Sequence, residues 1–228
     1  MSDSLADKLA RVRERINKAA LRAGRKPEEI TLVGVTKTVG REVIEEACRL
    51  GLTDFGENRI GDAEDKFTPL PYIPNTARLH LIGHLQTNKA KRAVAFFDMV
   101  HSVDSLRLAE MLDYQCGEQG KIMPALLEVN VSGESSKHGF SVAELESQIA
   151  ALLELRHLQW RGLMTMAPFV FAPEETRHVF RELRTLFDKI RNNVTIPHWK
   201  DLSMGMTNDF EIAIEEGATL VRIGRAIF

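Results

Sequence analysis

The sequence predicts an eight-stranded α/β barrel, that is, a (β/α)8 or TIM barrel. Short apolar runs alternate with longer amphipathic runs along all 228 residues. The apolar runs are hydrophobic throughout, as strands covered on both faces are. No long linker rich in Gly, Ser or Pro divides the chain, so we expect one domain over residues 1–228. Eight βα units in this length favour a closed barrel, with a doubly wound open sheet as the alternative.

The predicted strands are short runs rich in Val, Leu, Ile and Met, bounded by turn-forming residues. They cover residues 31–36, 53–57, 78–84, 99–103, 124–130, 158–166, 201–205 and 219–224. The sequence printed ends at Phe228, so the helix expected after the eighth strand is missing.

The predicted helices carry apolar residues at helical spacing between the strands. The first shows Leu5, Leu9, Val12 and Ile16, with Ser4 as a plausible N-cap. The others cover residues 41–51, 58–67, 88–97, 105–120, 141–155, 173–193 and 208–217. Because strand one lies beside strand eight in a closed barrel, we expect the N-terminal helix to fill the slot of the missing last helix.

Charge and composition exclude several classes of protein. The 30 basic and 32 acidic residues give a net charge of −2, so neither a nucleic acid nor a membrane is an expected partner. The N-terminus is charged and lacks the apolar core of a secretory signal, which predicts a cytoplasmic protein. Cys48 and Cys116 lie far apart in predicted helices, so we expect two reduced thiols.

The segment LVGVTKTVG, residues 32–40, ends an apolar strand with Lys37. One interpretation is that Lys37 extends into water, as most lysines do. The other is that Lys37 is a nucleophile that attacks a carbonyl group. Barrel enzymes place their sites at the carboxyl ends of the strands, which is where Lys37 would lie.

The loops after strands seven and eight carry the residues that a phosphate site needs. Ser203 offers a hydroxyl, Gly205 and Gly224 let the backbone approach an anion, and Arg225 offers an N–H group. The glycines could instead serve only tight turns. With Lys37 on the neighbouring strand, a phosphorylated aldehyde such as pyridoxal 5′-phosphate (PLP) fits the set.

Arg222 is predicted to point into the barrel, because it lies two residues before Gly224. It could pair with a carboxylate such as Glu128, or it could donate to the pyridine nitrogen of PLP. An arginine there would keep that nitrogen unprotonated and weaken carbanion chemistry. Met164 could pack under the cofactor or belong to the core.

Two histidines and a lysine have open roles. His80 and His84 are four residues apart, which suits zinc on a helix, but their segment is predicted as a strand. We therefore expect His80 to be structural, His84 to border the pocket, and no metal site. Lys137 is either a solvated loop residue or a transient second site for the aldehyde.

Seven segments together resemble one known family. They are VTKT around Lys37, FGEN (55–58), HLIGHLQTNKAK (80–91), SKHGF (136–140), GLMTMAP (162–168), LSMGMTNDFEIAI (202–214) and VRIGRAIF (221–228). They resemble the pyridoxal phosphate homeostasis protein family (the YggS or PROSC family). The resemblance implies a barrel similar to the N-terminal domain of bacterial alanine racemase, with PLP held as a Schiff base on Lys37. It also implies Asn58 near the ring, Arg222 at the ring nitrogen, and Ser203, Gly205, Gly224 and Arg225 at the phosphate.

Three functions remain open from the sequence. The first is a carrier or buffer in PLP (vitamin B6) homeostasis, without efficient turnover, acting as a monomer with PLP-dependent apoenzymes as transient partners. The second is an amino-acid racemase, although neither Tyr72 nor Tyr114 sits at a strand end to act as a second base. The third is a Schiff-base aldolase acting on a phosphorylated substrate, with Glu57 as acid/base.

Overall fold

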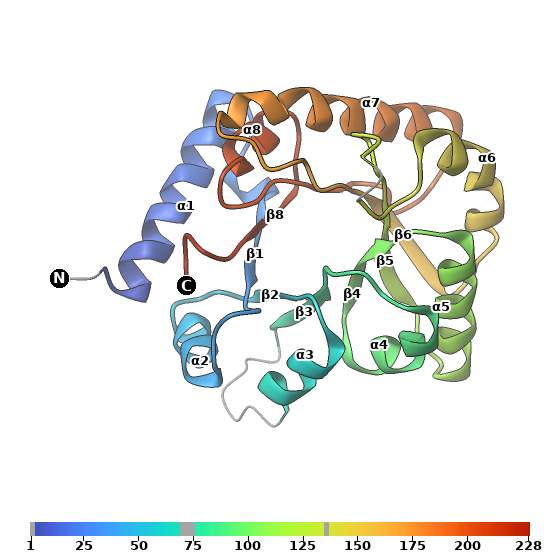
Figure 1. Cartoon of the computed structure of the whole chain (residues 1–228), viewed down its shortest axis with the longest axis horizontal. Coiled ribbons are helices and arrows are strands. Elements are labelled where there is room, and N and C mark those ends of the chain that lie inside the picture. Colours follow the sequence, from blue (N-terminus) through green and yellow to red (C-terminus); the bar gives the residue numbers. More distant parts are fainter. Residues whose placement is uncertain (1–2, 69–75, 135–136) are drawn as a thin grey trace.

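The predicted closed barrel is confirmed by the computed structural model, which describes residues 3–68, 76–134 and 137–228. Each strand pairs in parallel with the next, and β8 pairs back with β1 through Thr31 and Leu220 (Figure 1). The open-sheet alternative is therefore wrong. The strands are β1 (Thr31–Val35), β2 (Asp54–Glu57), β3 (Arg78–Leu81), β4 (Met99–Val103), β5 (Met123–Glu128), β6 (Leu158–Met164), β7 (Asp201–Ser203) and β8 (Leu220–Ile223).

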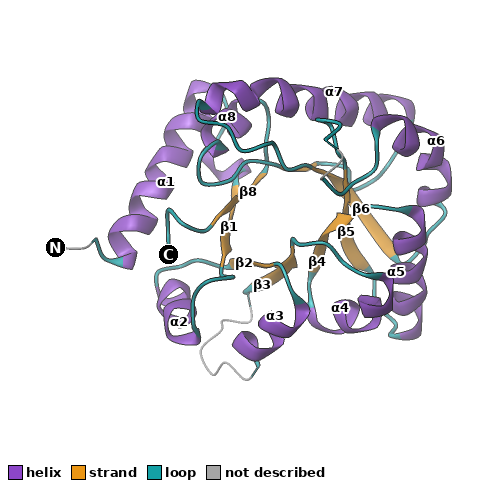
Figure 2. Cartoon of the chain, in the orientation of Figure 1, coloured by secondary structure: helices purple, strands orange, loops and turns teal. Residues whose placement is uncertain are grey.

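The helices form a layer around the barrel (Figure 2). They are α1 (Leu5–Arg22), α2 (Arg41–Arg49), α3 (Ile60–Phe67), α4 (Ala90–Phe96), α5 (Leu106–Glu118), α6 (Val142–Leu153), α7 (Arg177–Asn193) and α8 (Phe210–Glu215). Short 3-10 turns are η1 (Pro27–Glu29), η2 (Thr87–Lys89) and η3 (Pro173–Thr176). The helix predicted over 173–193 is thus split into η3 and α7. The proline-rich segment 69–75, with Tyr72, lies outside the described residues.

Helix α1 occupies the slot predicted for it, between α8 and α2 (Figure 1). Ser4 caps it in a reciprocal arrangement with Asp7, which satisfies N–H groups that a helix start leaves without partners. Arg13 donates to the carbonyl oxygens of Leu50 and Gly51 after α2, at 3.0 and 2.8 Å. These hydrogen bonds attach α1 to the turn that follows α2.

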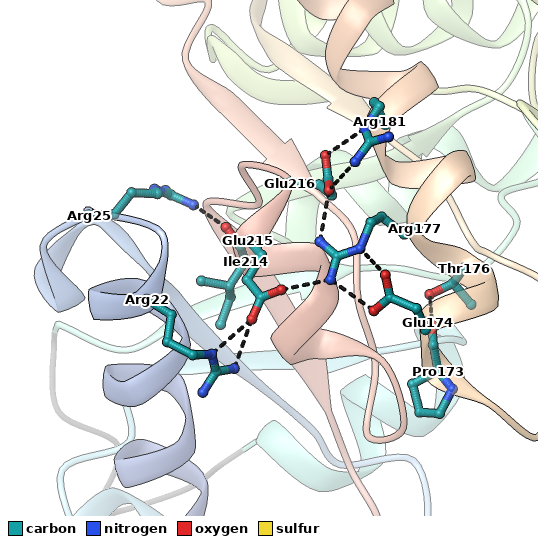
Figure 3. Close-up of polar contacts among 10 residues, drawn as sticks. All are labelled: Arg22, Arg25, Pro173, Glu174, Thr176, Arg177, Arg181, Ile214, Glu215 and Glu216. Carbon is teal, nitrogen blue, oxygen red and sulfur yellow. Dashed lines mark hydrogen bonds and ion pairs between the residues drawn. The ribbon is translucent and has the colours of Figure 1, made fainter.

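An ion-pair cluster joins α1, α7 and α8 on the outside of the barrel (Figure 3). Arg177 contacts Glu215 and Glu216, each at 2.8 Å. Arg22 contacts Glu215 from α1 at 2.9 Å, and Arg181 contacts Glu216 at 3.1 Å. The cluster therefore links the first and last helices of the chain to α7.

Two smaller expectations were tested by the structure. Cys48 and Cys116 are free thiols, as predicted, and both are buried. Burial raises the pKa of the Cys116 thiol to about 11, so this thiol stays protonated at neutral pH. Among the described residues, no helix combines the length and hydrophobicity that a membrane crossing requires. The cytoplasmic location stays a prediction.

Candidate functional site

A cavity of about 640 Å³ opens at the carboxyl ends of the strands. It is the end at which barrel enzymes build their sites. Five of the eight predicted site residues line it: Lys37, Asn58, Arg222, Gly224 and Arg225. The structure therefore brings together groups from β1, β2 and β8 that are up to 188 positions apart, from Lys37 to Arg225.

Lys37 lies two residues after the end of β1, with an exposed side chain. Its neighbour Thr36 is buried and donates to Glu57 Oε1 at 2.7 Å, which anchors the backbone here. Glu57 is also bound by Lys66 at 2.9 Å. No described residue forms an ion pair or hydrogen bond with the amine of Lys37, so this amine is open to a ligand.

The position of Glu57 bears on the aldolase alternative. Its side chain has no exposed surface, and its Oε1 already binds Thr36 and Lys66. Glu57 does not line the cavity. A general acid must come within hydrogen-bond reach of the reacting atoms, so the absence of Glu57 from the cavity lining argues against that role.

Arg222 is buried on β8, yet it reaches the cavity wall. Its Nη1 donates to Ser203 Oγ at 2.5 Å and its Nη2 donates to the carbonyl oxygen of Thr165 at 2.9 Å. Within the described part of the chain, Arg222 forms no ion pair, so the pairing with Glu128 considered from sequence is not made. Burial lowers the pKa of Arg222 to about 10, and the charges of Glu128 and Asp209 offset part of that effect.

A hydrogen-bonded chain runs from Arg222 through the barrel interior. Ser203 Oγ lies 2.9 Å from His101 Nδ1, His101 Nε2 lies 2.9 Å from His80 Nδ1, and His80 Nε2 lies 3.0 Å from Asp54 Oδ1. Because Asp54 can only accept and Arg222 can only donate, one consistent arrangement has every donor pointing from the arginine to the aspartate.

In this arrangement, His101 must be neutral to accept a hydrogen bond from the hydroxyl of Ser203. Burial, the neighbouring His80 and the Arg222 cation together hold the pKa of His101 well below its usual value. His80 is structural, as predicted, since its side chain is fully enclosed. The sequence does not indicate this role of His101, because a single sequence does not show which side chains meet across a barrel.

The remaining three predicted residues do not line the cavity. The hydroxyl of Ser203 is used by Arg222 and His101. Gly205 has φ of +92°, and a Cβ there would lie 2.6 Å from the Cβ of Ala213. This glycine therefore permits a close approach of the loop after β7 to α8. Met164 is enclosed in a small apolar cluster with Met99 and Leu126.

Other residues that the sequence interpretation did not assign to the site line the cavity, among them Met166, Thr207 and Asn208. Thr207 and Asn208 belong to the same loop as Ser203 and Gly205. The backbone N–H groups of Thr207, Asn208 and Arg225 have no hydrogen-bond partner among the described residues. Free amides in the loops after β7 and β8 are the donors that phosphate sites of barrels use. In the sequence, the hydroxyl of Thr207 and the side-chain amide of Asn208 could have indicated that this loop lines the cavity.

One acidic residue, Asp209, also lines the cavity. Asp209 accepts from the N–H of Met206 at 2.6 Å. Burial raises the pKa of Asp209 above its usual value. The basic side chains Lys37, Lys137 and Arg225 in the same wall have no acidic partner within the described part of the chain. The cavity is therefore suited to an anion.

No tyrosine among the described residues reaches the cavity. Tyr114 lies on α5 in the outer helix layer with 58% of its surface exposed. Tyr72 lies outside the described residues. The described chain thus offers no tyrosine as the second base that a two-base racemase requires.

Comparison with known proteins gives close relatives. Residues 8–228 match the family described as alanine racemase, N-terminal domain. The chain is 42% identical to the pyridoxal phosphate homeostasis protein of Aquifex aeolicus, covering 97% of this chain and 96% of the relative. It is 39% identical to the protein of the same name from Escherichia coli K12, covering 99% and 96%.

Solved structures agree with these relatives. PipY of Synechococcus elongatus, solved with PLP bound, has a TM-score of 0.85 and 35% identity, covering 99% of this chain and all of that chain. An alanine racemase of Clostridium difficile has a TM-score of 0.67 at 14% identity, and the match covers 55% of that enzyme. At that identity the likeness to the racemase concerns the fold alone.

Proposed function

The chain belongs to the family of pyridoxal phosphate homeostasis proteins, built on the alanine racemase N-terminal domain, and we propose from this membership that it binds PLP for intracellular PLP homeostasis. It holds the cofactor as a Schiff base on Lys37 and acts as a carrier or buffer. The relative PipY was solved with PLP bound.

One observation carries the proposal: the cavity joins a free lysine amine, a buried arginine and unpaired backbone amides. An aldehyde needs the amine, a pyridine nitrogen needs the donor, and a phosphate needs the amides. Lys37, Arg222 and the loops after β7 and β8 supply these groups around one cavity of about 640 Å³. The residues therefore fit PLP.

Each residue has a defined task in this proposal. PLP, when bound, supplies an aldehyde for reversible covalent attachment and a ring that can accept electrons. Lys37 provides the attachment point, and Arg222 donates to the ring nitrogen. Asn58 borders the ring, while the N–H groups of Thr207, Asn208 and Arg225 hold the phosphate with Gly224. Three predicted residues do not line the cavity and act indirectly. Ser203 orients Arg222, Gly205 allows the conformation of the loop after β7, and Met164 packs in the core.

The proposal favours a carrier over a racemase for two reasons. A protonated arginine at the ring nitrogen keeps that nitrogen without a proton and makes the ring a weaker electron acceptor. The described residues also offer no tyrosine in the cavity. PLP-dependent apoenzymes are the proposed transient partners, and a cytoplasmic monomer is the expected form.

A spectroscopic titration tests the proposal. Purified protein is freed of cofactor, titrated with PLP and followed in the near-visible range, where a lysine Schiff base absorbs. The wild type and the Lys91→Ala control should give the same saturating absorbance change, because Lys91 is an exposed residue of α4 outside the cavity. Lys37→Ala should give none. An equal change in Lys37→Ala would overturn the assignment of Lys37.

A further inference from the structure

Three side chains with metal-binding atoms converge at the ends of three consecutive strands. His84 follows β3, Asp104 follows β4 directly, and His138 lies in the loop between β5 and α6. Their nitrogen and oxygen ligand atoms all lie within 4.8 Å of one another. Asp104 directly follows β4, whereas His84 and His138 lie in the loops after β3 and β5, so three separate segments of the chain form the site.

The contacts within this group are close. His84 Nδ1 lies 2.8 Å from Asp104 Oδ2, and the rings of His84 and His138 stack with centroids 4.0 Å apart and 13° between their planes. The carboxylate of Asp104 is oriented by the hydroxyl of Ser105, which donates to its other oxygen at 3.2 Å. An oriented carboxylate and two adjacent imidazoles form a partly ordered donor set.

The donor set matches one class of ion. Two imidazoles and one carboxylate bind Zn²⁺ and related divalent transition metals, with water in the remaining positions. Ligand atoms around such an ion are about 3.3 Å apart, since each lies about 2.0 Å from the metal. The His138 ring must turn to direct a nitrogen lone pair at the ion, and its exposed position gives it room to do so.

A second histidine–carboxylate pair shows what the ordinary arrangement looks like. His157 Nδ1 lies 3.3 Å from Asp113 Oδ2 on the outside of the barrel. Asp113 also accepts from the backbone N–H of His157 at 2.6 Å, so this pair joins two chain segments. Within the described ranges no third metal-binding side chain joins this pair, whereas His84 and Asp104 have His138.

We propose that His84, Asp104 and His138 form a binding site for a divalent transition-metal ion beside the PLP cavity. His84 lines that cavity, and so does Lys137, the neighbour of His138. A bound ion therefore fixes the loop that carries Lys137 against the ends of β3 and β4. The site stands on these side chains alone and does not depend on PLP binding.

Calorimetric titration of the cofactor-free protein with Zn²⁺ tests the proposal, in a buffer that does not bind zinc. We expect one ion per chain with a Kd of about 10 μM or tighter. His138→Ala and Asp104→Asn should each weaken binding about tenfold or more, because each removes a ligand. His157→Ala is the matched control and should bind as the wild type does.

The outcomes separate cleanly. Thermal unfolding in the presence of a chelator should be the same for His138→Ala and wild type, which shows that the variant is folded. Binding that is undiminished in His138→Ala would place the ion elsewhere and overturn the site. A wild type that binds zinc no tighter than the double variant of His84→Ala with His138→Ala would overturn it as well.

Discussion

Arg177 and Arg222 lie in two regions that shift the pKa of the guanidinium group in opposite directions. Arg177, in the outer helix layer, binds Glu174, Glu215 and Glu216 (Figure 3), and these hydrogen bonds raise its pKa. Arg222, in the barrel interior, has a hydroxyl and a carbonyl as acceptors, and burial lowers its pKa to about 10. The outer cation is neutralised by carboxylates, while the inner one is not.

The presence or absence of carboxylate partners distinguishes the charges that stabilise the fold from those that are available to bind a ligand. In the outer cluster, the ion pairs join α1, α7 and α8, so their charges are balanced within the chain. At the cavity, Lys37, Lys137 and Arg225 have no acidic partner among the described residues. A buried or clustered positive charge without a counter-charge is unfavourable unless an anion joins it. PLP, through its phosphate, is such an anion.

The largest expected effect concerns the carboxylate that acts on Arg222 from inside the barrel. Burial, with the charge of Asp104, raises the pKa of Glu128 to about 7, and its Oε2 has no partner. The folded state therefore binds a proton between pH 4.5 and 7 that the unfolded state releases, so Glu128 lowers stability as pH rises through this window. Its contribution falls by up to roughly 3 kcal/mol.

Glu128→Gln tests this pH dependence. The free energy of unfolding is measured in urea at pH 5 and pH 8 for cofactor-free wild type and variant. The variant should gain about 3 kcal/mol relative to wild type between the two pH values, because glutamine does not titrate. Parallel pH dependences of the two proteins would show that Glu128 is not the titrating group.

The next effect concerns the inner arginine itself. Arg222→Gln removes the charge, and PLP affinity should fall about 100-fold, or roughly 2.7 kcal/mol. The affinity is measured by PLP titration at fixed pH. Arg161→Gln is the control, because Arg161 is an arginine of β6 that pairs with Asp201 at 2.8 Å outside the cavity. Equal affinities in both variants would remove Arg222 from the cofactor site.

The outer arginine should show the reverse pattern. Arg177→Ala should lower the free energy of unfolding by about 1–2 kcal/mol, since a networked and partly buried pair contributes more than an isolated exposed one. PLP affinity should not change. Arg191→Ala, which removes an exposed pair with Asp188, is the matched control and should cost less than about 0.5 kcal/mol. A weaker PLP affinity in Arg177→Ala would break the division between the two regions.

The smallest effect is expected at the exposed edge of the cavity. Arg225→Ala should weaken PLP about threefold to tenfold, because it removes an exposed charge near the phosphate but leaves the backbone N–H groups. Stability should stay within about 0.5 kcal/mol of wild type. The weakening should shrink as salt is raised, since the charge is solvated. A loss that is independent of salt would point to a packing role for Arg225.

The sequence was sufficient for the barrel because its signals are local. Each strand is a short apolar run and each helix has its own periodicity, and the eightfold alternation then restricts the topology. The slot for α1 followed from the same count. Lys37, Arg222, Gly224 and Arg225 could be placed at the cavity because strand ends are predictable to within a few residues, whereas Asn58 was assigned by the family resemblance alone.

Contacts between side chains on different strands of the barrel could not be predicted from the sequence. Ser203 has the right chemistry for phosphate, but its side chain points inward to Arg222 and His101, whereas Thr207 lies farther along the loop and lines the cavity. A shift of a few positions decides which side chain faces the cavity, and loop conformation decides that shift. The partnership of His84 with Asp104 and His138 depends on three loops, so their sequence spacing does not show it.

The most direct test of the central claim is the identity of the lysine that carries PLP. The protein is saturated with PLP, reduced with borohydride, digested and analysed by mass spectrometry. A pyridoxyl group on Lys37, with none on the paired Lys66 or on the solvated Lys91, is the predicted result. A protein that takes up no PLP, or one modified at Lys66 in place of Lys37, would contradict the account of an unpaired amine at the end of β1.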